Sequence, residues 1–205
     1  MVTNRVNSVY TAMNGMNQTP QSSTDWAPQM VPCTVHTVRR MTPQSVVVTL
    51  DPGAALPRFR HTPGQRVTFC LDINNTPCLR SYNLVNQLGD LPQVAVKQVA
   101  EGGSSQLFNE QLQPGDVLQV APPMGHLYDH RLDYKAHHLF LFAAGSGITP
   151  MFSVAQHALK ARPDHRVTLI YANSSARSIM MQQDLDRMAG SKRLEVFHVL
   201  GDGAT

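Results

Sequence analysis

The pattern of expected secondary structure changes near residue 137, and this change limits the folds that the chain can adopt. Before it, short runs rich in Val and other strand formers alternate with breakers such as Asp51-Pro52-Gly53 and Pro114-Gly115. The runs cover residues 31–38, 45–50, 66–71, 80–85, 93–99 and 116–121. Successive short strands of this kind predict a six-stranded antiparallel, Greek-key-like β barrel, because closing a sheet removes its exposed edges.

After residue 136 the expected strands alternate with helices instead. Strands are expected at 138–143, 166–172 and 194–200, with helices at 150–161 and 179–189 between them. This βαβαβ order predicts a partial α/β doubly wound domain of the nucleotide-binding type. The first strand of such a sheet is central, so we expect its other side to be covered by another chain or by further residues of a longer protein.

These patterns divide the chain into three expected parts. Residues 1–30 are rich in Asn, Ser, Thr, Gln and Met and predict a flexible arm, 31–130 form the barrel domain, and 136–205 form the incomplete α/β domain. A short helix should interrupt the barrel series, where Ser104-Ser105 can cap a segment whose apolar side chains share one face. Those apolar residues are Leu107, Phe108 and Leu112.

Composition excludes several classes of protein. A net charge of +3, with 17 Lys and Arg against 14 Asp and Glu and no dense basic run, argues against nucleic-acid binding. No stretch approaches the ~18 consecutive apolar residues of a membrane helix, and the first residues lack a secretory signal, so we expect a cytoplasmic protein without membrane insertion. Cys33, Cys70 and Cys78 are spaced for neither a disulfide framework nor a metal site. Redox chemistry would therefore require an organic cofactor or a partner.

Three short motifs could hold such a cofactor. AAGSGITP at 143–150 joins a strand to a helix, where glycines allow close backbone approach and unpaired amides can bind phosphate. RSYN at 80–83 places Arg80 and Tyr82 on one face of a strand, suited to a phosphate and a flat heterocycle. EGGSSQLFNE at 101–110 places glycines and serines at a helix start, a further anion site. Each motif alone also suits an ordinary turn, an exposed cross-strand pair or a capped helix.

The order of these motifs along residues 31–205 resembles that of the flavin reductases of the ferredoxin-NADP reductase family. The resemblance implies an FAD-binding barrel, a domain that takes NAD(P)H as substrate, and an NAD(P)H-dependent oxidoreductase. It assigns catalytic positions to Tyr82 against the flavin ring, Asn83 near the reactive nitrogen of the flavin, and Thr149 between nicotinamide and flavin. Asn83 departs from the Ser or Thr usual in the family, and an amide can still donate a hydrogen bond there.

The resemblance also implies a set of cofactor-binding residues on both domains. Ser174 and Arg177 belong to this set because they follow the second strand of the α/β domain with no carboxylate before Asp184, which favours NADPH. The full set is Arg80, Ser81, Tyr82, Asn83, Val96, Lys97, Gln98, Gly102, Gly103, Ser104, Ser105, Gly145, Ser146, Gly147, Thr149, Pro150, Ser174 and Arg177.

The expected function is hydride transfer from NAD(P)H to FAD, followed by electron transfer to a small molecule or to an iron-sulfur or oxygenase protein. Two other interpretations stay open at this point. One is a flavin-binding electron-relay subunit without its own complete NAD(P)H site, and the other is an interaction module that binds no cofactor.

Overall fold

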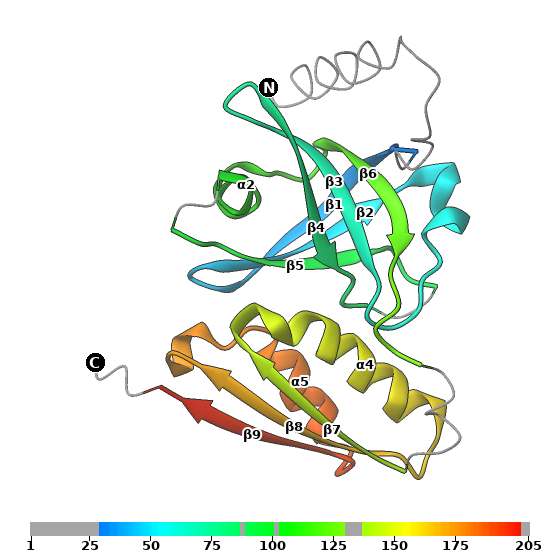
Figure 1. Ribbon diagram of the computed structural model, residues 1–205, viewed down its shortest axis with the longest axis vertical. Helices are drawn as coiled ribbons and strands as arrows, with labels where there is room; N and C mark the ends of the chain where they lie inside the picture. Colours follow the sequence, from blue (N-terminus) through cyan, green and yellow to red (C-terminus); the bar gives the residue numbers. More distant parts are fainter. Residues whose placement is uncertain (1–28, 87–88, 101–102, 130–136, 202–205) are drawn as a thin grey trace, which may run out of the picture.

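The structure, a computed structural model, describes residues 29–86, 89–100, 103–129 and 137–201. A six-stranded sheet forms one half of the molecule and a three-stranded sheet with its helices forms the other (Figure 1). The expected arm at 1–30 lies almost entirely outside the described residues, and the expected domain boundaries stay predictions.

The first sheet is antiparallel throughout and runs in the order β4-β3-β6-β1-β2-β5. Its strands are β1 (Val31–Thr42), β2 (Ser45–Asp51), β3 (Arg66–Ile73), β4 (Thr76–Asn83), β5 (Gln93–Lys97) and β6 (Val117–Met124). The last strand, β6, lies between β3 and β1, which is a Greek-key crossover, and a bridge between Leu84 and Val94 joins the two ends of the sheet. The six-stranded antiparallel sheet expected from the sequence is confirmed.

Strand β4 begins four residues before the run expected at Arg80. The cause is a tight hairpin, because Asn74 and Asn75 both adopt positive φ angles, of 54° and 59°, and asparagine tolerates this conformation in two-residue turns. The chain therefore pairs with β3 directly after the turn, from Thr76 onward.

A short helix covers the barrel between β5 and β6. It comprises α2 (Gly103–Gln106) and the π-helical turn η2 (Leu107–Gln111), and the 3₁₀ helix η1 (Gly53–Phe59) follows β2. Leu107, Phe108 and Leu112 are buried, as their shared face predicted. The predicted serine cap is wrong, because Ser104 and Ser105 lie inside the first turn and their side chains bond to neighbouring segments instead.

The second sheet is parallel, in the order β7-β8-β9, and both of its main helices lie on one face (Figure 1). Its elements are β7 (His138–Ala144), η3 (Gly145–Gly147), α4 (Ile148–Ala161), β8 (Arg166–Asn173), η4 (Ala176–Ser178), α5 (Gln182–Ala189) and β9 (Leu194–Leu200). The predicted βαβαβ order is confirmed. None of the described helices is both long and apolar enough to cross a membrane.

Two groups of buried apolar side chains stabilise the fold. One fills the barrel, and the other lies beneath α4 and α5 and extends into the barrel through Val47, Val85 and Ala95. Strand β2 is consequently buried on both faces, with Val46 and Val48 in the barrel core and Val47 in the second core. The two halves of the molecule therefore share a continuous apolar contact.

Candidate functional site

The face of β4 carries the first part of the candidate site. Arg80 is exposed, and within the described residues its guanidinium donates one hydrogen bond, of 2.9 Å, to the carbonyl of Leu79. The hydroxyl of Ser81 points to the opposite face and lies 2.8 Å from that of Thr68. Arg80 thus keeps most of its N–H groups available for an anion, whereas Ser81 is engaged within the sheet.

Tyr82 links this strand to the helix α2. Its ring makes edge-on contacts with Phe69 and Phe108, at centroid distances of 5.7 and 5.1 Å. Burial raises the pKa of the Tyr82 hydroxyl, and a hydrogen bond with the Ser104 side chain opposes that rise. Because Ser104 contacts Tyr82, the start of α2 lies beside the strand that carries Arg80. The two elements expected to bind the flavin pyrophosphate are therefore neighbours.

Gly103 allows the start of α2 to approach β3. A Cβ atom at this position would lie 2.6 Å from the Cγ2 atom of Ile73, which is closer than two carbon atoms can pack. Ser105 is buried, and its hydroxyl accepts a hydrogen bond of 3.1 Å from the amide of Val99. Gly102, also expected to bind the cofactor, lies outside the described residues.

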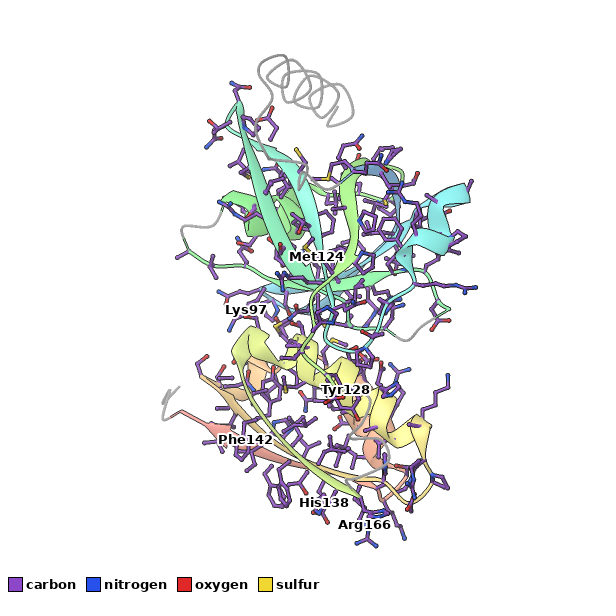
Figure 2. The ribbon with its side chains drawn as sticks, turned by 45° about the vertical axis from the view of Figure 1, so that its right-hand side comes forward. Lys97, Met124, Tyr128, His138, Phe142 and Arg166 are labelled. Carbon is purple, nitrogen blue, oxygen red and sulfur yellow. The ribbon has the colours of Figure 1, made fainter. Side chains whose placement is uncertain are left out.

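Strand β5 contributes its last residue and the residue that follows it. The side chain of Val96 is buried in the barrel core, so only its backbone can face a ligand. Gln98 donates a 2.6 Å hydrogen bond to Glu110, and hydrogen bonds from Gln106 and Gln98 hold the pKa of that carboxyl below its usual value. Lys97 has a different environment, because its Nζ atom would lie 3.7 Å from a Cβ atom placed on Gly145. The barrel and the glycine turn therefore meet at Lys97 (Figure 2).

The glycine turn joins β7 to α4 as the sequence predicted. Gly145 has a φ of +49°, a conformation that side chains disfavour, and the amide of Ile148 closes the turn on the carbonyls of Gly145 and Ser146. Thr149 is buried, and its hydroxyl donates a 3.1 Å hydrogen bond to the Ser146 carbonyl. Among the described residues outside its own turn, none places an atom within 4 Å of a Cβ built on Gly147, so the backbone is open to a ligand on that side.

Tyr171 is a site residue that the sequence analysis did not identify. Its hydroxyl donates a 2.9 Å hydrogen bond to the Gly145 carbonyl and so ties the turn to β8. The side chain is fully buried, which raises its pKa to about 12. A buried tyrosine hydroxyl usually has a hydrogen-bond partner. The position of Tyr171 near the end of an apolar strand is therefore the feature of the sequence that could have identified it.

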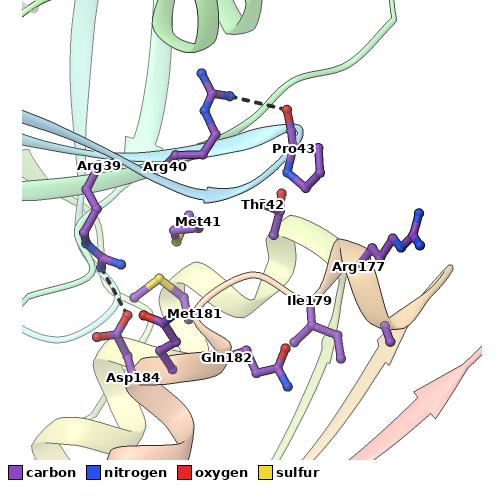
Figure 3. A pocket seen from close by; sticks show the side chains of 12 residues that line it. Arg39, Arg40, Met41, Thr42, Pro43, Arg177, Ile179, Met181, Gln182 and Asp184 are labelled. Atoms are coloured by element: carbon purple, nitrogen blue, oxygen red, sulfur yellow. Dashed lines mark hydrogen bonds and ion pairs between the residues drawn. The ribbon is translucent and has the colours of Figure 1, made fainter.

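The segment after β8 holds the residues expected to select the nucleotide. Ser174 is engaged locally, with its hydroxyl 3.2 Å from that of Ser178, which also forms a capping box with Ser175. Arg177 is exposed and lines a hollow of about 240 Å³ that Arg39 and Arg40 of β1 also line (Figure 3). The structure thus leaves Arg177 accessible, and Ser174 is held by its neighbours.

The barrel edge, where β5 and β6 end, carries two exposed apolar residues. Met124 is the last residue of β6 and is 42% exposed (Figure 2), and Val99, two residues after the end of β5, is 59% exposed. Asn83 is half-buried and pairs across the sheet with Arg66, which in turn pairs with Met124 on β6. A flat heterocycle with a charged tail needs both an apolar border and cationic or amide donors. The residues at this edge fit FAD on both counts.

Comparison with known proteins supports the same conclusion. Residues 32–128 match a family model described as an oxidoreductase FAD-binding domain, and residues 141–204 match one described as an oxidoreductase NAD-binding domain. The chain belongs to the ferredoxin-NADP reductase family. It contains an FAD-binding domain and an NAD-binding domain of the kinds that these two models describe.

Curated relatives and solved structures agree with this assignment. The ferredoxin reductase component of 3-ketosteroid-9-alpha-monooxygenase from Rhodococcus rhodochrous is 33% identical over 75% of this chain and 44% of its own length. A component of the 1,2-phenylacetyl-CoA epoxidase of Escherichia coli is 32% identical over 74% of this chain and 43% of its own length. The solved CS-b5R domains of human Ncb5or are 25% identical, with a TM-score of 0.74 over 86% of this chain and 53% of that structure. The chain thus spans less than half the length of these two curated relatives.

Proposed function

We propose that this protein is an NAD(P)H-dependent flavin reductase that passes electrons to a protein acceptor. The observation that carries the proposal is the meeting of the barrel edge with the glycine turn, where Lys97 reaches Gly145. A flavin on the barrel and a nicotinamide on the turn must come together for hydride transfer. The proximity of Lys97 to Gly145 supports the proposal, because it brings the end of β5 next to the glycine turn.

The residues proposed to orient or bind the cofactors come from both domains. Arg80 and the amides near Gly103 bind the flavin pyrophosphate, because both supply donors and one supplies positive charge. Tyr82 and Asn83 orient the flavin ring from β4. Thr149, fixed by its bond to Ser146, holds the first turn of α4 so that the turn can receive the nicotinamide. When bound, FAD accepts hydride from NAD(P)H and releases electrons to the acceptor, and the protein supplies binding and orientation.

The names of two relatives support one class of acceptor. One is named as the ferredoxin reductase component of a monooxygenase and the other as a component of an epoxidase. We therefore propose that the acceptor is an iron-sulfur or oxygenase protein rather than a small molecule.

The absorbance spectrum of the purified protein, before and after addition of NADPH or NADH under argon, tests the proposal. We expect flavin absorbance that bleaches with at least one nucleotide, with NADPH the more effective because Arg177 is accessible. A yellow protein that neither nucleotide bleaches would instead be an electron-relay subunit. A colourless protein that gains no flavin on reconstitution would overturn the proposal.

A further inference from the structure

The strand β2 contains three consecutive valines with different partners. Val46 and Val48 are fully buried in the barrel core. Val47, which is 3% exposed, points the other way and belongs to the core shared with the α/β domain, together with Ile148 and Phe152 of α4. Strand β2 thus packs on both domains. Of its three valines, Val47 is the one that belongs to the core shared with the α/β domain.

The side chains that Val47 joins lie next to the glycine turn. Ile148 directly follows Gly147, so the helix packed against the barrel begins where the turn ends. On the barrel side, Ala95 belongs to the same core as Val47, and Lys97 two residues later on β5 reaches Gly145. A shift of α4 across this contact would therefore move the turn relative to the barrel edge.

Two adjoining hollows lie between segments of the two domains. Their volumes are about 240 and 610 Å³, and Met181 and Asp184 line both of them. The first hollow lies between the β1–β2 hairpin and α5, where Arg39 pairs with Asp184 at 3.2 Å (Figure 3). Arg39 is half-exposed, and ion pairs of that kind contribute little to orientation or stability. The apolar side chains at the centre must therefore set the distance between the domains.

We propose that Val47 is a positioning residue for hydride transfer, which fixes the approach of the glycine turn to the flavin edge of the barrel. This inference rests on the proposed function. Displacement of reacting groups by about 1 Å can slow a reaction about 100-fold. Removing two methyl groups at Val47 leaves a cavity that lets α4 move toward or along the barrel.

The test compares Val47→Ala with Val48→Ala, the same substitution on the adjacent residue. The measurements are flavin content, thermal midpoint, and the limiting rate of flavin bleaching at saturating NADPH in stopped flow. We expect Val47→Ala to retain its flavin, and dithionite should still bleach that flavin. The limiting rate of bleaching by NADPH should fall about tenfold or more. Val48→Ala should lose thermal stability and flavin together, and the flavin that remains should bleach at the wild-type rate.

A second variant, Phe152→Leu, probes the other side of the same contact and should reproduce the loss of rate without loss of flavin. If NADPH bleaches the wild type and the limiting rate is unchanged in both Val47→Ala and Phe152→Leu, this inference is overturned and the proposed function is not. A wild type that binds flavin but is bleached by neither nucleotide would overturn the inference together with the proposed function.

Discussion

Arg80 is an exposed cation on the candidate flavin edge, close to the start of α2. It lies on β4 beside Tyr82, which contacts Ser104, and its hydrogen bond to the Leu79 carbonyl uses one guanidinium nitrogen. Hydrogen bonds to charged groups contribute about 1.5–3 kcal/mol. At the residue scale, the affinity for flavin should therefore depend on this side chain far more than folding does.

We predict that Arg80→Ala weakens FAD binding about 10-fold to 100-fold, from loss of a charged hydrogen bond. The thermal midpoint of the flavin-free protein should not change, because Arg80 is exposed. Flavin titration followed by fluorescence measures the affinity. Arg166→Ala, which removes an exposed arginine from the α/β domain, is the control (Figure 2). Equal flavin affinity in the two variants would contradict the assignment of Arg80.

We predict that Tyr171→Phe raises the KM for the nicotinamide nucleotide several-fold and leaves flavin content unchanged. The variant loses the hydrogen bond to the Gly145 carbonyl, which contributes about 0.5–1.5 kcal/mol. Because burial raises the pKa of Tyr171 to about 12, the hydroxyl is protonated at ordinary pH and the effect should be constant from about pH 6 to about pH 9. Steady-state kinetics at several pH values measures the KM and its dependence on pH. A KM equal to that of the wild type would show that the turn does not need this bond.

At the scale of elements, the carboxylate of Asp164 contributes to holding the turn between α4 and β8. Asp164 accepts hydrogen bonds of 2.9 and 2.8 Å from the Arg162 guanidinium and lies 2.9 Å from His137. The hydrogen bonds from Arg162 are the largest cause that lowers the pKa of Asp164, to about 2. Asp164 therefore links His137, directly before β7, to Arg162, directly after α4.

We predict that Asp164→Asn lowers the thermal midpoint at pH 7, and that the difference from the wild type disappears in acid. A carboxyl whose pKa is lowered in the folded state stabilises it above its unfolded pKa of 3.8, and that stability is lost as the pH falls toward about 2. Thermal melts followed by circular dichroism between pH 7 and about pH 2 measure the difference. Asp90→Asn removes a charge from an exposed loop and is the control. A difference that persists in acid would mean that packing, not charge, is responsible.

At the scale of the whole molecule, one face of the three-stranded sheet is not covered by any described element. Phe140, Phe142 and Phe197 are 60%, 67% and 56% exposed there, and Val199 is 52% exposed. Both helices of the domain pack on the other face (Figure 1). Parallel sheets are normally covered on both faces, so this surface is unusually apolar for one that contacts water.

We predict that Phe142→Lys reduces the fluorescence of a bound apolar dye such as ANS and leaves flavin binding unchanged. The charge interrupts the apolar surface at its most exposed ring. Gln111→Lys, which adds the same charge to an exposed position on the barrel helix, is the control. If both variants bind the dye equally, the dye binds elsewhere on the molecule.

Patterns that act over a few residues could be read from the amino-acid sequence alone. The valine-rich runs predicted the barrel strands, the helical spacing of Leu107, Phe108 and Leu112 predicted a buried face, and alternation along β4 placed Arg80 with Tyr82. The boundaries were less accurate, because the hairpin at Asn74-Asn75 extends β4 beyond its apolar run. These features depend on backbone preference and side-chain period, and both are local.

Contacts between distant segments could not be read in this way. The run from Val46 to Val48 shows that β2 is apolar on both faces, but not that Val47 shares a core with a helix about one hundred residues later. The contact of Lys97 with the Gly145 turn and the bond from Tyr171 to Gly145 likewise join separate elements. Residue types set which side chains can bind a cofactor, because charge and hydrogen-bonding capacity belong to each residue. Packing across the two domains sets where those groups meet, because that position minimises exposed apolar area for the chain as a whole.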